Sequence, residues 1–134
     1  MASTPGGAFG FASGLIIQEF GYDEDADQAL REAAETETGT ALVDEDYEDV
    51  ADSAIVWWRD DDGDVDDLTD LLVDAQANLD GAGVIWVLTP KARTTGSVPT
   101  SEIEEAAATA GMHATSAASM GSRWSGIRVS SRGR

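Results

Sequence analysis

Two continuous apolar runs on either side of a helical pattern constrain the fold of this chain more than any other feature. Residues 53–59 (SAIVWWR) and 83–90 (GVIWVLTP) are rich in strand-favouring residues and lack polar alternation, as expected of strands covered on both faces. Between them, apolar residues recur at helical spacing over residues 65–79. This order predicts two parallel strands joined by a crossover helix, and therefore an α/β fold. Trp57 and Trp58, adjacent in the first run, are expected to point to opposite faces of the sheet and to pack under helices.

The first half of the chain shows the same alternation. Residues 15–21 and 40–43 are predicted strands, and residues 23–37 between them place alanines and a leucine on one helical face, before Gly39 as a C-cap. Residues 45–52 predict one or two acidic helical turns. These elements extend the predicted parallel sheet toward the N-terminus.

The C-terminal part of the chain is predicted to end in a hairpin. Ser101 and Glu104 form a capping-box pattern that predicts the start of a helix, and Gly111 predicts its end. Predicted strands at residues 113–119 and 125–130 are separated by the segment MGSRW, which suffices for a hairpin but not for a crossover helix. We therefore predict a three-layer, Rossmann-like open sheet that is mostly parallel, with an antiparallel C-terminal edge hairpin and strand order 2-1-3-4-6-5.

The length of 134 residues fits one domain. We expect a flexible N-terminal arm at residues 1–13, a single α/β domain at residues 14–130 and a short basic tail at residues 131–134. No apolar run approaches the ~20 residues that a membrane helix needs, and the N-terminus has neither the basic start nor the apolar core of a secretion signal. These features predict a cytoplasmic protein that does not bind a membrane.

Acidic residues are concentrated in the N-terminal part of the chain. Residues 1–80 hold 23 acids and two bases, Arg31 and Arg59, whereas residues 81–134 hold three acids and six bases. This distribution disfavours nucleic-acid binding, which depends on a basic face. The absence of cysteine excludes disulfides, thiolate zinc sites and thiol nucleophiles.

Several segments resemble a known family. IIQEFGYDEDADQALREA, LVDEDYEDVADSAIVWWRDDDGDVDDLTDLLVDA, GVIWVLTPK and WSGIRV are similar to an uncharacterised, mainly actinobacterial family catalogued as domain of unknown function 3052. The resemblance covers residues 14–130 and implies no activity. The second half also resembles the C-terminal half of class I S-adenosylmethionine methyltransferases, in the order of its strands and helices and its final hairpin. This likeness is an analogy of fold and does not fix function.

The turn after the first predicted strand argues against an intact methyltransferase. Such enzymes need a glycine-rich turn at this point, so that the backbone and a helix N-terminus can approach the cofactor. Here the turn reads EFGYDEDAD, in which Gly21 is followed by Tyr22 and four acids. A bulky ring and concentrated negative charge would obstruct a nucleotide phosphate and disfavour the carboxylate of S-adenosylmethionine. The sequence therefore favours a degenerate relative of that fold, with no cofactor.

The aspartate-rich segment DDDGD at residues 60–64 allows two interpretations. An EF-hand calcium loop fails, because no frame places the acids, the glycine and the final glutamate at their required positions. Weak, water-rich binding of Mg²⁺ or Ca²⁺ by Asp60, Asp62 and Asp64 stays open, since hard cations accept carboxylate oxygens. The interpretation that we favour is a solvated turn without a metal, in which Asp62 or Asp64 caps the following helix.

Four further side chains are candidate contacts for a ligand or a partner. Lys91 and Arg93 follow the end of a predicted central strand, at the edge where open α/β sheets bind ligands; pairing with surface acids is the alternative. Arg123 and Trp124 lie in the predicted hairpin turn. Trp124 either faces a partner, as tryptophans at interfaces do, or folds over the edge of the sheet.

Two functions of different classes follow from these features. The favoured hypothesis is a non-catalytic interaction or regulatory module on a degenerate Rossmann-like, methyltransferase-like frame, which presents an acidic face to a basic protein partner. It has no catalytic residues, no cofactor and no metal. The alternative is a small ligand-binding protein or methyltransferase-related enzyme that uses the cleft near Lys91, Arg93 and residues 60–64.

Overall fold

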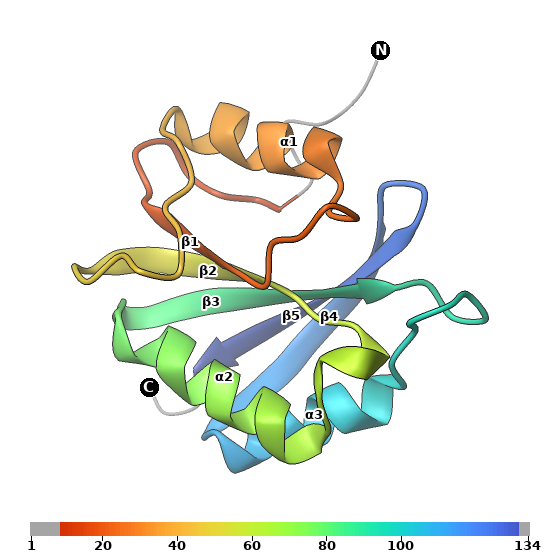
Figure 1. Cartoon of the computed structure of the whole chain (residues 1–134). Helices are drawn as coiled ribbons and strands as arrows, with labels where there is room; N and C mark the ends of the chain where they lie inside the picture. Colours follow the sequence, from red (N-terminus) through yellow and green to blue (C-terminus); the bar gives the residue numbers. More distant parts are fainter. Residues whose placement is uncertain (1–8, 132–134) are drawn as a thin grey trace.

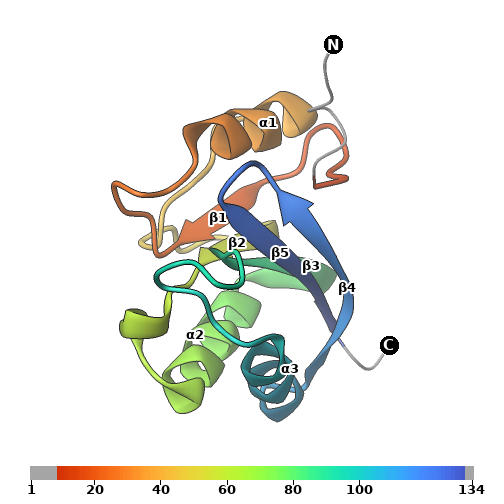
Figure 2. The same cartoon turned by 90° about the vertical axis from the view of Figure 1, so that its right-hand side faces the viewer.

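A computed structural model describes residues 9–131 as an open sheet between two helical layers. α1 covers one face of the sheet, and α2 and α3 cover the other (Figures 1 and 2). The five strands are ordered β1-β2-β3-β5-β4. In chain order the elements are β1 (Ile17–Phe20), α1 (Gln28–Thr38), β2 (Ala51–Trp57), a 3₁₀ turn (Asp60–Asp62), α2 (Val65–Ala77), β3 (Leu79–Pro90), α3 (Thr100–Thr109), β4 (Met112–Met120) and β5 (Trp124–Ser131).

The strand order confirms the topology predicted from the sequence. β1, β2 and β3 are parallel, and β5 runs antiparallel to both β3 and β4. The predicted strand at residues 40–43 is reduced to one parallel bridge between Val43 and Gln18, held by two backbone hydrogen bonds. It occupies the position beside β1 that the predicted order assigns to it. The sheet is therefore the mostly parallel, Rossmann-like sheet with an antiparallel edge hairpin that the sequence predicts.

Two predicted helix features are wrong. Residues 45–52 form no helical turns, since Tyr47 N–H donates to the Asp44 carbonyl in a tight turn and β2 already begins at Ala51. Ser101 does not cap α3, which begins one residue earlier, after Pro99. Pro99 disfavours a helical conformation at Val98 before it and is itself the N-cap, and no side chain caps the helix.

The other two helices begin at aspartate caps. The Asp27 carboxylate accepts hydrogen bonds from the N–H groups of Ala29 and Leu30 at the start of α1. Asp64 and Asp67 form a reciprocal capping box at the start of α2, which confirms the predicted capping role of Asp64. The backbone N–H of Asp67 is the main cause of the lowered pKa of Asp64. Within residues 9–131, no helix is long and apolar enough to cross a membrane.

The sheet separates two hydrophobic cores. Trp57 belongs to the core under α1 and Trp58 to the core under α2 and α3, so the prediction that the two rings point to opposite faces is confirmed. Both are buried. The larger core contains Phe20, Ala54, Val56, Trp58, Leu68, Leu72, Ala75, Ile85, Val87, Val98, Ile103, Ala106, Ala107, Met112, Ile127 and Val129.

The N-terminal segment differs from the expected flexible arm. Residues 1–8 lie outside the described residues, but Phe9 is buried and packs edge-on against Trp86, and its ring stacks on Phe11. The Glu37 carboxylate accepts hydrogen bonds from both phenylalanine N–H groups, and the Trp86 indole N–H donates to the Phe9 carbonyl. This short packed segment therefore covers part of the Trp86 ring. The expected tail at residues 131–134 is described only at Ser131, which ends β5.

Candidate functional site

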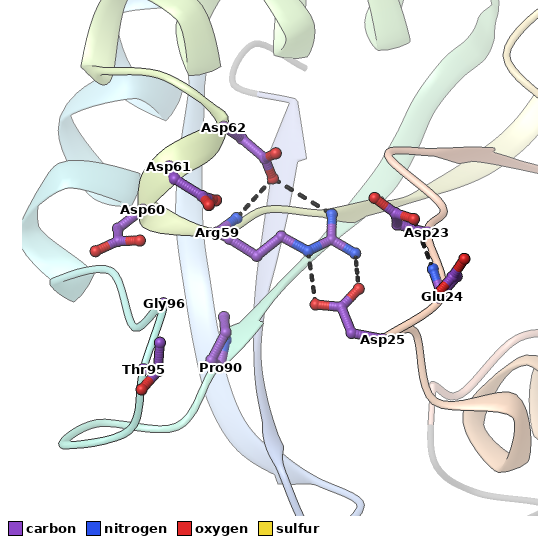
Figure 3. Close-up of a pocket in the computed structure, with 10 residues that line it drawn as sticks. All are labelled: Asp23, Glu24, Asp25, Arg59, Asp60, Asp61, Asp62, Pro90, Thr95 and Gly96. Carbon is purple, nitrogen blue, oxygen red and sulfur yellow. Dashed lines mark hydrogen bonds and ion pairs between the residues drawn. The ribbon is translucent and has the colours of Figure 1, made fainter.

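The carboxyl ends of β1 and β2 form the crevice at which an open α/β sheet is expected to bind ligands. From β1 the chain passes through α1 to Val43 on one side, and then returns to β2 on the other side. Such a switch in direction leaves a crevice between the two strands. A cavity of about 470 Å³ opens at this edge (Figure 3). It is lined by Asp23, Glu24, Asp25, Arg59, Asp60, Asp61, Asp62, Pro90, Thr95 and Gly96.

The Arg59 side chain lies across this crevice. Its guanidinium makes a bidentate ion pair with Asp25 and a longer contact of 3.3 Å with Asp62 (Figure 3). It also donates to the backbone carbonyls of Gly21, at 2.8 Å, and Trp57, at 3.3 Å. Arg59 is 8% exposed. One side chain therefore joins the ends of β1 and β2 to the acidic loops on both sides.

The charges around the crevice hold Arg59 and Asp25 ionised. Burial lowers the pKa of Arg59, but the hydrogen bonds and charges of Asp25 and Asp62 raise it more, so that the net direction is upward. The hydrogen bond from Arg59 lowers the pKa of Asp25 below its usual value. The cavity is lined by six carboxylates and this one base. Its electrostatic potential therefore favours cations over anions.

Replacing Asp25 with asparagine should reduce stability in a pH-dependent way. A carboxylate whose pKa is lowered in the folded state stabilises the fold above its unfolded pKa of about 3.9, and this stabilisation is lost as the pH falls through the folded pKa. Because the Asp25 side chain is 54% exposed, solvent screening limits the effect to about 1 kcal/mol or less. Urea unfolding of wild type and Asp25→Asn measures this effect. The difference between their free energies of unfolding should be constant above about pH 5 and should shrink below about pH 4.

Asp61→Asn is the matched control for this pH series, since Asp61 makes no ion pair within residues 9–131. If the difference in free energy of unfolding between wild type and Asp25→Asn does not change with pH, the assigned ion pair is contradicted.

Residues of the same chain occupy the surroundings of the glycine turn after β1. Gly21 has a φ of +76°, and a Cβ atom at this position would lie 2.4 Å from the Trp57 carbonyl oxygen. Its backbone N–H donates to the Glu45 carboxylate at 2.8 Å. This glycine therefore permits the close approach of two strand ends, and its N–H group is already bound to an anion of the same chain.

A second ion pair fixes the helix that follows this turn. Arg31 on α1 binds both oxygens of Glu19 on β1, each at 2.8 Å, and the Trp57 indole N–H donates to the same carboxylate at 2.8 Å. Glu19 is buried, and its hydrogen bond raises the pKa of Arg31. The Tyr22 ring covers the outer face of Arg31. Both bases of the acidic half of the chain are thus paired internally.

The aspartates of residues 60–64 have separate roles. Asp60 and Asp61 are exposed, Asp62 binds the backbone N–H and the side chain of Arg59, and Asp64 caps α2. In the part of the chain that the structure describes, no three Asp, Glu or His side chains are grouped so as to hold a metal ion. Asp60, Asp62 and Asp64 therefore form no preformed group of three metal ligands in the described residues.

Two of the other predicted contact residues line a neighbouring cavity of about 400 Å³. Arg123 and Trp124 line it, but Trp124 is only 3% exposed. Its ring packs edge-on against Trp57, with centroids 4.8 Å apart, and faces the Arg59 guanidinium. Trp124 therefore folds into the core and is not a partner-facing side chain.

Lys91 and Arg93 lie in the loop after β3. Neither lines the two cavities described above, to which this loop contributes Thr94, Thr95 and Gly96. Within residues 9–131, neither base forms an ion pair, so the predicted pairing with surface acids is absent from the described residues.

Sequence reasoning missed Arg59 and Asp25, the two residues that fill the crevice. They are 34 positions apart, and no local pattern joins them. One available signal was composition, because Arg59 is one of only two bases in residues 1–80 and directly follows a buried strand. A lone base among many acids at a strand end indicates an internal ion pair.

Sequence comparison finds relatives of this chain and a family model that matches it. Uncharacterized proteins of Mycobacterium tuberculosis and Mycobacterium bovis are 45% identical over 128 residues, which are 96% of this chain and 78% of each relative. A family model described as "Protein of unknown function (DUF3052)" matches residues 7–133.

Class I methyltransferases share the fold at low sequence identity. Magnesium protoporphyrin IX methyltransferase from Synechocystis PCC 6803, with bound S-adenosylmethionine, aligns with a TM-score of 0.58 at 8% identity, over 90% of this chain and 71% of that one. Mitomycin 7-O-methyltransferase aligns with a TM-score of 0.69 at 13% identity, over 95% of this chain and 52% of that one. These similarities show a methyltransferase-like fold.

Proposed function

The chain belongs to the DUF3052 family, and we propose that it is a non-catalytic, cytoplasmic interaction or regulatory module that presents an acidic surface to a basic protein partner. The methyltransferase-like frame supplies the scaffold in this proposal, and the surface at the carboxyl ends of the strands supplies the binding site.

The position of Arg59 is the main observation that supports this proposal. Its buried guanidinium occupies the crevice between β1 and β2, and its charge is balanced by Asp25 and Asp62 of the same chain. The N–H of Gly21, in the turn where a dinucleotide fold receives its ligand, is bound to Glu45. A cofactor would have to displace both contacts, and its carboxylate would meet six protein carboxylates. This arrangement supports loss of cofactor binding.

The exposed acids at the rim support a basic partner. Asp23, Glu24, Asp60 and Asp61 are exposed around the cavity, and the two loops that carry them are held together through Arg59. Charges on such a fixed rim would attract a lysine- or arginine-rich segment and orient it during association. The attraction should weaken as added salt screens the charges.

A decalysine peptide tests this surface. We expect wild-type protein to bind it in a fluorescence-anisotropy titration, with an affinity that falls steeply between low and physiological salt. The double variant Asp60→Asn/Asp61→Asn should stay folded and bind at least about fivefold more weakly, because two rim charges are lost. S-adenosylmethionine, added in a parallel thermal-shift assay, should leave the melting temperature unchanged.

Asp70→Asn/Asp74→Asn is the matched control variant. It makes the same change in net charge on exposed positions of α2, away from the crevice. If it weakens decalysine binding as much as the rim variant does, binding reflects only net charge and the proposed surface is wrong. Stabilisation by S-adenosylmethionine would overturn the non-catalytic assignment.

A further inference from the structure

A third cavity, of about 320 Å³, differs from the acidic crevice in charge. It lies on the α2 and α3 side of the sheet, between the end of β3, the β4–β5 hairpin and the start of α3. Its lining contains no acidic residue, although the chain has 26 acids. The crevice at Arg59 is lined by six. This cavity is therefore one place on an acidic protein at which an anion would meet no carboxylate in the wall.

Three hydroxyl side chains cross the floor of this cavity in one row. Thr89 on β3 pairs with Ser125 on β5, and Ser125 pairs with Ser119 on β4. Directly paired residues place their side chains on the same face of a sheet, and all three line the cavity. The next row toward the centre of the sheet is apolar, with Val87 and Ile127 in the core. The hydroxyls thus mark where the core ends and the cavity begins.

The Thr89 hydroxyl is buried without a protein partner. Thr89 is 4% exposed, and within residues 9–131 its side chain makes no hydrogen bond. A buried hydroxyl without a partner costs free energy, and native proteins rarely retain one. Val87 and Ile85, two and four positions earlier on the same face of β3, are fully buried and apolar. The hydroxyl of Thr89, at the next position on this face toward the strand end, is therefore an exception to the pattern of this strand.

The start of α3 adds unpaired donors. This helix has ten residues, its N-cap is Pro99, and no side chain caps it, in contrast to the aspartate caps of α1 and α2. Thr100, its first residue, lines the cavity. The first turn of a helix leaves backbone N–H groups without intrahelical partners, and its dipole favours negative charge nearby.

Two bases are the sequence neighbours of a residue that lines the same cavity. Lys91 and Arg93 flank Ala92, which lines it, and neither forms an ion pair with any residue of the described range 9–131. Glu102 lies in the first turn of α3 but does not line the cavity. Lys91 and Arg93 do not line it either, so the wall of this cavity is uncharged on a protein whose net charge is −18.

We propose that this cavity binds the oxyanion end, a phosphate or a carboxylate, of a small molecule. The hydroxyls of Thr89 and Ser125 donate hydrogen bonds to the oxyanion, and the free N–H groups at the start of α3 and the nearby Lys91 and Arg93 stabilise its charge. The site shares only Pro90 with the lining of the Arg59 crevice and does not depend on the proposed acidic partner surface.

Inorganic phosphate and acetate are the probes for this site. In ¹H–¹⁵N correlation spectra, addition of phosphate or acetate at millimolar concentration should shift the amides of Thr89, Thr100 and Ser125 in a saturable way. Sodium chloride at the same ionic strength should not. The stronger response identifies the class of the natural ligand as phosphate or carboxylate.

Thr89→Val separates a ligand-binding hydroxyl from a structural one. The substitution keeps the shape of the side chain and removes the unpaired hydroxyl, so it should raise the melting temperature by roughly 3 °C. It should weaken binding of the preferred probe about tenfold, as loss of one hydrogen bond to a charged group does. Ser125→Ala should weaken binding in the same direction, which keeps the test decisive if Thr89→Val does not fold.

Thr69→Val is the matched control. Thr69 lies on α2 and does not line the cavity, and its hydroxyl donates to the Val65 carbonyl. It should leave probe binding unchanged. Shifts that do not saturate, shifts that chloride reproduces, or unchanged affinity in both Thr89→Val and Ser125→Ala would overturn the proposal.

Discussion

Truncating Trp57 to alanine should lower the free energy of unfolding by about 3–5 kcal/mol, the usual cost of removing a large buried aromatic ring. The side chain is 1% exposed and packs edge-on against Trp124 in the core under α1. Its indole N–H also donates to the buried Glu19 carboxylate at 2.8 Å. Truncation therefore creates a cavity and removes one hydrogen bond from a buried charge. Such a loss is a large share of the stability of a small protein.

Urea denaturation followed by circular dichroism measures this effect, and two variants control it. Trp57→Phe restores much of the ring volume without the N–H group, so it should retain part of the lost stability. Val73→Ala, at a position 49% exposed on α2, should change stability by less than about 0.5 kcal/mol. Unchanged stability in Trp57→Ala would show that the ring is not part of the core, and would place it at an interaction surface.

Replacing Arg59 with alanine should destabilise the fold by about 2–4 kcal/mol, because several buried polar groups lose their partner together. The carbonyls of Gly21 and Trp57 lose a donor, and Asp25 and Asp62 lose their counter-charge. The effect stays below that of a fully buried pair, since the Asp25 side chain is 54% exposed and water can hydrate it.

Guanidinium chloride would screen this ion pair, so urea is again the suitable denaturant. Arg59→Lys keeps the charge but cannot reproduce the bidentate contact. Its free energy of unfolding should therefore lie between those of wild type and Arg59→Ala. Arg93→Ala, at an exposed position in the loop after β3, is the matched loss of one positive charge and should have little effect. Equal stability of Arg59→Ala and Arg93→Ala would mean that the crevice does not depend on the guanidinium.

The order of the strands could be predicted because it depends on local and short-range features. Continuous apolar runs identified β2 and β3 as covered on both faces, and the five residues between the predicted last strands, 120–124, required a hairpin. The N-cap aspartate of α2 and the C-cap Gly39 of α1 follow from preferences that act within one turn of helix.

The contents of the candidate site could not be predicted, because they depend on contacts between distant residues. Asp25 reaches Arg59 only after β1 and β2 have paired, and the burial of Trp124 depends on the position of Trp57 on another strand. The packing of Phe9 likewise depends on the position of Trp86 on β3. Composition indicates that a base or an aromatic ring will find a partner, but the topology decides which one.

The packed N-terminal segment has a consequence for the order of folding. The Phe9 carbonyl and the Trp86 indole are 77 residues apart, and the Glu37 carboxylate that binds the Phe9 N–H lies at the end of α1. The surface that receives this segment is complete only when α1 and β3 are both in place. We therefore expect this segment to form its contacts late, so that the contacts affect mainly the rate of unfolding.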